Sequence, residues 1–185
     1  MPAPFPHSLR GRIVALGRHA AHNAQNQDVR DVVRLRALDA CEYCLMPTSG
    51  QFEVDHIVPQ ARWADYQANA YAALRRRDRL NLTTPHHIAN YAWACVFCNS
   101  AKGGRRRPSG AGRLFDPRYD NWPDHFEFLS STSYAAIAGL TMIGAETVTA
   151  LNFNRGGPEG PPVARHVAIM EGIYPPAWAR AAYKL

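Results

Sequence analysis

The chain has 185 residues, of which 46% are hydrophobic, 10% aromatic and 19% charged, with a net charge of +6. This length suits one domain of ordinary size with short extensions, and the composition excludes a wholly disordered chain. The longest apolar stretch, 134–145, is far shorter than the roughly 20 residues that a membrane helix needs. We therefore expect a cytoplasmic protein without a membrane partner, whose thiols stay reduced.

The first half of the chain begins with an arm and a helix. Residues 1–27 are polar and contain proline, so we expect an N-terminal arm with at most one weak helix. Asp28 can cap a helix whose apolar residues form one stripe that ends before Cys41. Periodicity and bounding prolines and glycines predict four further elements: strands over 52–58 and 90–94, and helices over 63–74 and 98–103.

The second half changes character after a basic, glycine-rich connector. Its predicted elements are a hairpin of 125–129 with 134–140, a helix capped by Thr141, a loop over 156–162 and a short aromatic tail over 174–183. We therefore divide the chain into three parts: an arm (1–27), a core (28–108) and a C-terminal extension packed on the core (109–185).

The cysteines form two CxxC pairs that account for every cysteine in the chain: Cys41, Cys44, Cys95 and Cys98. In a reducing compartment this pattern predicts a tetrahedral structural zinc ion held by four thiolates at about 2.3 Å. A thioredoxin-like redox site is the alternative, but it needs one CxxC at the start of a helix in a βαβ unit. The metal would close the long loop between the pairs, and we look for function in that loop.

Positive charge is concentrated between Arg75 and Arg113. This segment holds nine lysine or arginine residues and a single acid, Asp78. Arginine is the preferred cation throughout the chain, yet that preference does not explain why acids avoid this segment. A basic segment in an otherwise nearly neutral chain predicts a polyanionic partner, usually nucleic acid.

The loop between the cysteine pairs contains the sequence Val54-Asp55-His56-Ile57-Val58-Pro59. Asn90 stands before the second pair, and Asn99 follows it directly. In this order, the residues from Cys41 to Gly104 resemble the HNH endonuclease family. The pattern of that family is a CxxC knuckle, a hydrophobic-Asp-His-Ile-x-Pro strand, an Asn opening a second strand, and a second CxxC followed by His or Asn.

The resemblance implies an α+β fold: a small ββα-metal core stapled by a structural zinc, with an N-terminal helical arm and a C-terminal extension of strands and a helix. Two departures from the family pattern stand out. Asn99 occupies a position where many relatives have His, which corresponds to a branch that reads His-Asn-Asn. The connection between His56 and Asn90 is longer than usual in the family.

The same resemblance implies metal-dependent hydrolysis of DNA phosphodiester bonds. His56 would be the general base, because an imidazole with a pKa of about 6.5 is largely neutral at working pH. Asp55 and Asn99 would hold a catalytic Mg²⁺ or Mn²⁺, since hard ions prefer oxygen ligands. Asn90 would pin the loop that carries His56. Phosphate contacts are expected from seven cations: Lys102, Arg75, Arg76, Arg77, Arg105, Arg106 and Arg107.

Other interpretations compete with this one. A lone histidine in a hydrophobic strand is usually a core residue, and for His86 and His87 we expect surface or substrate contacts rather than metal binding. The HxE sequence of His125 and Glu127 is similar to that of zinc deaminases, but it follows both cysteine pairs instead of preceding one. Two alternative functions stay open. One is a non-catalytic zinc-stabilised module that binds DNA or RNA, with DNA the expected partner. The other is a scaffold whose zinc only stabilises the fold.

Overall fold

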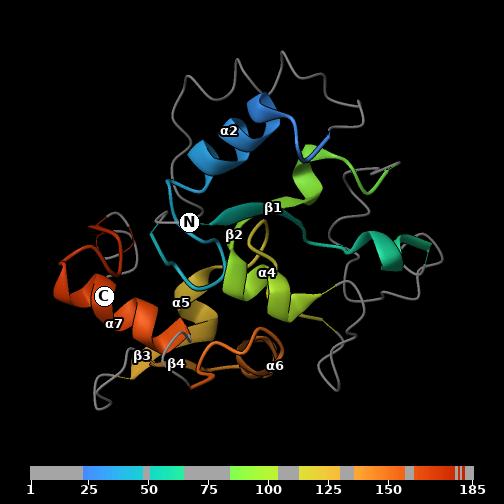
Figure 1. Ribbon diagram of the computed structural model, residues 1–185. Helices are drawn as coiled ribbons and strands as arrows, with labels where there is room; N and C mark the ends of the chain where they lie inside the picture. Colours follow the sequence, from blue (N-terminus) through green and yellow to red (C-terminus); the bar gives the residue numbers. More distant parts are fainter. Residues whose placement is uncertain are drawn as a thin grey trace.

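The computed structural model describes residues 23–47, 51–64, 84–103, 113–129, 136–156, 161–177, 179 and 181. Within these residues the fold is α+β, with two separate two-stranded sheets (Figure 1). The elements in chain order are α2 (Gln27–Arg36), β1 (Phe52–His56), η1 (Gln60–Arg62), η4 (Ile88–Asn90), β2 (Tyr91–Cys95), α4 (Val96–Lys102), α5 (Trp122–His125), β3 (Phe126–Leu129), β4 (Ala136–Gly139), α6 (Met142–Ala150) and α7 (Pro161–Met170).

Helix α2 is shifted from its predicted bounds. Its N-cap is Asn26, whose side-chain oxygen accepts hydrogen bonds from the backbone N–H groups of Asp28 and Val29, so Asp28 lies in the first turn. The helix ends at Arg36 because Leu38 and Asp39 have φ angles of 53° and 58°, which no α-helix contains. The predicted apolar stripe is confirmed by three buried valines: Val29, Val32 and Val33.

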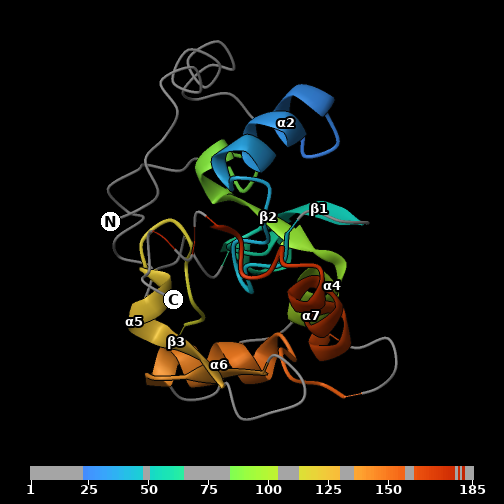
Figure 2. The same ribbon diagram turned by 90° about the vertical axis from the view of Figure 1, so that its left-hand side faces the viewer.

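Strands β1 and β2 pair antiparallel, in a register that runs from Phe52 opposite Cys95 to His56 opposite Tyr91. The predicted strands are confirmed with shifted ends: β1 stops at His56 rather than at residue 58, and β2 starts one residue after Asn90. Helix α2 covers one face of this sheet and α4 covers the other (Figures 1 and 2). The site residues of β1 therefore face different helices, because successive side chains of a strand point to opposite faces.

Helix α4 follows β2 without a loop. It begins at Val96, two residues before the predicted start, and ends at Lys102. Gly103 stops it with a φ of 51°, a conformation that glycine adopts at little cost. The end of this helix was predicted correctly. Strands β1 and β2 and helix α4 all contact one another and form one β1–β2–α4 unit.

The C-terminal extension contains the predicted hairpin, formed by β3 and β4, and the helix α6 capped by the Thr141 hydroxyl. The expected loop over 156–162 was wrong at its end, because Pro161 opens α7. Prolines fit the first turn of a helix, where the backbone N–H groups lack partners anyway. The Trp122 indole donates to the Tyr43 carbonyl at 2.9 Å, and the Tyr174 hydroxyl donates to the Cys44 carbonyl at 2.8 Å. The extension thus packs on the turn that carries the first cysteine pair.

Two sequence predictions lie wholly or largely outside the described residues. They are the N-terminal arm up to residue 22 and the helix over 63–74, of which only residues 63 and 64 are described. Among the helices that are described, none has the length and apolar character to cross a membrane.

Candidate functional site

The four cysteines converge from two distant segments. Cys41 and Cys44 lie in the turn after α2, where the Cys41 N–H donates to the Met46 carbonyl at 2.7 Å. Cys95 ends β2 and Cys98 lies in the first turn of α4. All four side chains are buried, and their sulfur atoms lie within 4.8 Å of one another.

This arrangement can hold a metal ion. The Cys44 and Cys95 sulfurs are 3.8 Å apart, and two sulfurs each about 2.3 Å from a tetrahedral ion would also be about 3.8 Å apart. None of the four cysteines is in a disulfide. The sulfur-only donor set and its spacing are compatible with a structural zinc ion.

The thiols also influence one another. Hydrogen bonds from the Cys41 and Cys95 thiols hold the pKa of Cys44 well below its usual value. The contact with Cys41 raises the pKa of Cys95, and burial raises the pKa of Cys98. Because metal ligands must be thiolates, binding of a divalent cation to this cluster would be coupled to loss of the thiol protons.

A buried ion pair lies on the α4 face of the sheet. Asp55 is 7% exposed and Lys102 is 5% exposed. The Lys102 ammonium donates to both Asp55 carboxylate oxygens, at 2.9 and 2.7 Å, and to the His56 carbonyl at 2.5 Å. The Tyr43 hydroxyl donates to Asp55 Oδ2 at 2.5 Å, and burial together with the Asp55 charge holds the pKa of Tyr43 well above its usual value.

The position of Lys102 corrects its predicted role. A phosphate contact requires an ammonium group that solvent and a ligand can reach, whereas Lys102 is enclosed and already bonded to a carboxylate. It is the cationic partner of Asp55 in this structure. Lys102 lies in the last turn of α4, three residues after Asn99, and residues three apart lie on the same side of a helix. Both side chains therefore lie on the side of α4 that faces β1.

His56 ends β1 with its imidazole half-buried. Its Nε2 atom is 3.1 Å from the Gln60 side-chain nitrogen and 3.3 Å from Nδ1 of His86. The ring also packs edge-on against Tyr91, with 4.9 Å between centroids. Burial lowers the pKa of His56 to about 4, so the imidazole is neutral near pH 7.

Asn90 is fully buried and holds the loop that follows His56. Its side-chain oxygen accepts from the Val58 N–H at 2.9 Å, and its side-chain nitrogen donates to the Val58 carbonyl at 3.1 Å and to the Pro85 carbonyl at 2.9 Å. One amide thus connects both ends of the long connection between β1 and η4. These contacts are compatible with the positioning role that the sequence analysis expects for Asn90.

Asn99 projects from α4 toward β1, where its amide nitrogen donates to the Glu53 carboxylate. Sequence reasoning did not single out Glu53. The signal was available, because residues 53 and 55 of a strand share one face. The structure therefore places two carboxylates, those of Glu53 and Asp55, along the face that α4 covers.

His86 is a second residue whose place was not foreseen. We expected surface or substrate contacts for His86 and His87. The structure places His86 beside His56, while Nδ1 of His87 accepts from the Ala89 N–H at 3.1 Å and caps η4. The sequence gives no local signal of the contact between His56 and His86, because residues 30 positions apart are brought together only by the tertiary fold.

The arginines predicted to contact phosphate lie outside the described residues. They are Arg75, Arg76, Arg77, Arg105, Arg106 and Arg107. Arg113, at the edge of the same basic segment, is ion-paired with Asp120, and that contact raises its pKa. Nucleic-acid binding by this segment therefore stays a prediction.

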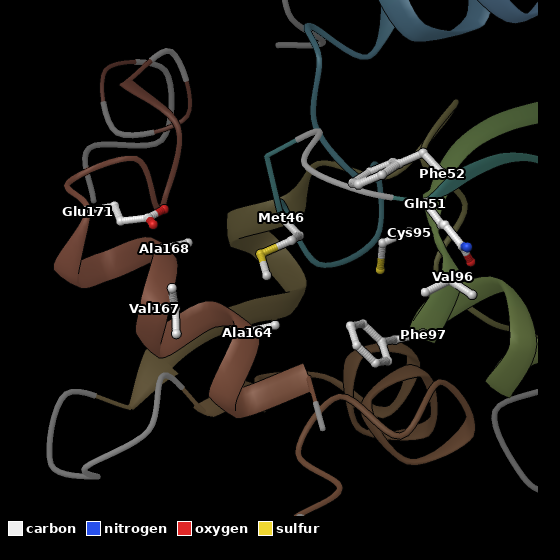
Figure 3. A pocket seen from close by; sticks show the side chains of 10 residues that line it. All are labelled: Met46, Gln51, Phe52, Cys95, Val96, Phe97, Ala164, Val167, Ala168 and Glu171. Atoms are coloured by element: carbon white, nitrogen blue, oxygen red, sulfur yellow. The ribbon is translucent and has the colours of Figure 1, made fainter. Parts of the chain in front are cut away.

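A mostly apolar pocket of about 420 Å³ lies between α7 and the start of α4 (Figure 3). Figure 3 shows Met46, Phe97 and Ala164 around it, with Cys95 at its inner side. The histidine and carboxylate residues described above do not line it. The pocket thus adjoins the cysteine cluster and is separate from the His56 site.

Comparisons of the chain with protein-family models, with curated proteins and with solved structures found no match.

Proposed function

We propose that this protein is a metal-dependent endonuclease of the HNH type, which hydrolyses DNA phosphodiester bonds at the β1–β2–α4 unit. The observation that carries the proposal is the half-buried imidazole of His56, held at the end of β1 one residue after the buried Asp55, in surroundings that lower its pKa. A general base must be unprotonated at working pH and fixed in position. His56 meets both conditions, because burial keeps it neutral and Asn90 ties down the loop behind it.

We further propose that the cysteine cluster holds a structural zinc ion. Its ligands come from the turn before β1 and from the β2–α4 junction, so the ion would join the two segments that frame the site. Such sites contribute folding energy directly. The zinc would have no part in the chemistry, since four protein ligands leave no position for water.

The catalytic ion would be Mg²⁺ or Mn²⁺, held through the oxygens of Asp55 and Asn99. The fit rests on the donor set: Asp55 and Glu53 place two carboxylates on the face of β1 that α4 covers, and Asn99 of α4 lies beside Glu53. Without the ion, the Asp55 carboxylate is bonded to the Lys102 ammonium. A bound divalent ion would offset charge on the phosphate and on the leaving oxygen. Lys102 must then give up its contact with Asp55, and the exposed Glu53 near Asn99 can supply a further carboxylate.

The protein residues would have distinct tasks. His56 Nε2 would accept a proton from the attacking water, while Asn90 keeps the His56 loop in place. The arginines of the basic segment would contact flanking phosphates. Attack by water with departure of the 3′ oxygen would leave products with a 5′-phosphate and a 3′-hydroxyl, as the resemblance implies.

One observation favours a second candidate function, a non-catalytic zinc-stabilised module that binds nucleic acid. The Asp55 carboxylate is already saturated by Lys102 and Tyr43, which a purely structural role also requires. Such a module needs the basic segment and the cysteine cluster, but not His56.

Incubation of purified protein with supercoiled plasmid separates the two functions. With Mg²⁺ or Mn²⁺ we expect nicked or linear DNA, and with EDTA intact plasmid. His56→Ala should lower the cleavage rate by about 10² to 10⁴-fold at unchanged DNA affinity, because it removes only general-base assistance. His166→Ala, which changes an exposed histidine on α7, is the matched control. Intact plasmid with wild type in either metal would favour the binding module, and cleavage by His56→Ala at the wild-type rate would exclude His56 as the general base.

DNA as a partner has its own test. Replacing Arg105, Arg106 and Arg107 by Ala should weaken binding to all sequences alike, and the slope of log affinity against log salt should fall by up to about 0.9 per lost phosphate contact. An unchanged slope would show that these arginines do not touch phosphate.

A further inference from the structure

We propose that His56, His86 and Gln60 form a second metal site, separate from the cysteine cluster, which binds a borderline transition ion such as Zn²⁺ or Co²⁺. The three residues come from the end of β1, from the segment before η4 and from η1. The polar atoms of His86 and Gln60 both lie within 3.3 Å of one atom, Nε2 of His56.

The distances between these atoms fit a shared ion. His56 Nε2 and His86 Nδ1 are 3.3 Å apart, and two nitrogens each about 2.0 Å from a tetrahedral zinc ion would be about 3.3 Å apart. The Gln60 amide lies 3.1 Å from the same His56 nitrogen. A half-turn of that amide exchanges its nitrogen for its oxygen, so Gln60 can supply a third, oxygen ligand.

The scaffold keeps these groups together before any ion binds. Asn90, which is fully buried, bonds to Val58 on the β1 side and to Pro85 next to His86. Both histidines therefore stand within two residues of atoms fixed by one amide. The rings meet edge-on, with 5.3 Å between centroids and an interplanar angle of 82°, so the contact is made by a ring edge rather than by stacking.

This site differs in position and chemistry from the proposed Mg²⁺ or Mn²⁺ site. Asp55 faces α4, where it bonds to Lys102, whereas His56 projects from the opposite face of β1. Imidazole nitrogen suits zinc, cobalt and nickel, and hard ions such as Mg²⁺ prefer oxygen. The two sites should therefore select different ions.

Occupancy would have a consequence that rests on the proposed function. The His56 lone pair cannot bind an ion and accept a proton at the same time. Zn²⁺ beyond the amount held by the cysteines should therefore inhibit DNA cleavage, and Mg²⁺ should not displace it.

The test is metal binding, measured by equilibrium dialysis with elemental analysis on the full chain in Zn²⁺. Wild type should hold two zinc ions per chain and His86→Ala one. The zinc affinity of the second site should fall by more than about 100-fold in His86→Ala, because loss of a direct ligand should cost more than loss of an outer-shell partner does. His166→Ala, which removes an exposed histidine on α7, should still hold two. Gln60→Glu should bind the second ion more tightly than wild type, since a carboxylate replaces the amide oxygen.

Two results would overturn the proposal: a single ion in wild type, or a second ion that persists in both His86→Ala and His56→Ala. In that case the two imidazoles share only a hydrogen bond. Because Gln60→Glu predicts a gain, the test does not depend on the folding of the alanine variants. Two bound ions in a chain that does not cut DNA would refute the nuclease and leave the metal site standing.

Discussion

The Lys102–Asp55 pair offers a test that connects stability with metal binding. Lys102→Met removes the ammonium group and keeps an unbranched apolar side chain of similar length. Asp55, which is 7% exposed beside the lysine, then has the Tyr43 hydroxyl as its remaining donor among the bonds described. A buried carboxylate without a cation is costly, because the protein interior solvates charge far less well than water does.

The size of the effect follows from the contacts. Three hydrogen bonds disappear, two to Asp55 and one to the His56 carbonyl. Removal of one partner from a buried ion pair costs about 3–5 kcal/mol, and we expect a loss in this range. The double variant Lys102→Met/Asp55→Asn should regain most of it, since an amide is neutral and can still accept from Tyr43.

The assay is urea unfolding of the zinc-loaded chain, with and without Mg²⁺. If Asp55 is a ligand of the catalytic ion, Mg²⁺ should stabilise Lys102→Met more than wild type, because the lysine no longer competes for the carboxylate. At about ten times the dissociation constant this stabilisation is about 1.4 kcal/mol. The double variant should lose the Mg²⁺ effect.

Two outcomes would refute this reasoning. A loss below about 1 kcal/mol in Lys102→Met would mean that water reaches Asp55 and replaces the ammonium. An equal effect of Mg²⁺ on the single and the double variant would remove Asp55 from the set of metal ligands.

Three further predictions concern the rest of the fold. Cys95→Ser, or removal of zinc by a strong chelator, should unfold or aggregate the chain, because the metal joins distant segments; elemental analysis that finds no zinc in well-folded protein would contradict this. Burial lowers the pKa of His56 to about 4, so between about pH 6.5 and pH 4 the unfolded chain binds a proton at this histidine and the folded chain does not. The free energy of unfolding of wild type should therefore fall by up to about 2 kcal/mol relative to that of His56→Gln as the pH falls from 6.5 to 4. Parallel pH profiles of unfolding for the two proteins would contradict this prediction. In a denaturation assay, Gly144→Ala should lower the free energy of unfolding by about 1–3 kcal/mol despite the better helix propensity of alanine, because the new Cβ would lie 2.1 Å from the His125 carbonyl oxygen. Gly156→Ala is the control: a Cβ there would have no atom within 4 Å, so this change should be neutral in the same assay.

The elements of this fold were predictable where local chemistry decides them. The hairpin before Thr141 and the helix that it caps follow from alternation and from a hydroxyl at an N-cap. The cysteine cluster followed from two CxxC pairs alone. Helix α7 was not predicted: the sequence favours a loop over 156–162, whereas Pro161 and Pro162 form the first turn of the helix.

The site was less predictable, because its contacts join residues far apart in the sequence. Lys102 was expected at a phosphate, since a lysine in a basic segment is usually exposed. Its burial depends on the pairing of β1 with α4, which places Asp55 opposite the end of that helix. The neighbour of His56 is His86, and no periodicity connects these two residues.

The long connection between β1 and β2 need not disturb the site. Asn90 bonds to Val58 at its start and to Pro85 near its end, so the chain leaves and returns at one buried amide. Arg36 of α2 adds bonds to the Ile88 and Tyr91 carbonyls at 3.1 and 2.5 Å, which anchor the return to the helix beside the first cysteine pair. Among the described residues, these contacts hold the connection at both ends next to His56, and we therefore expect a change of length within residues 65–83 to leave the site in place.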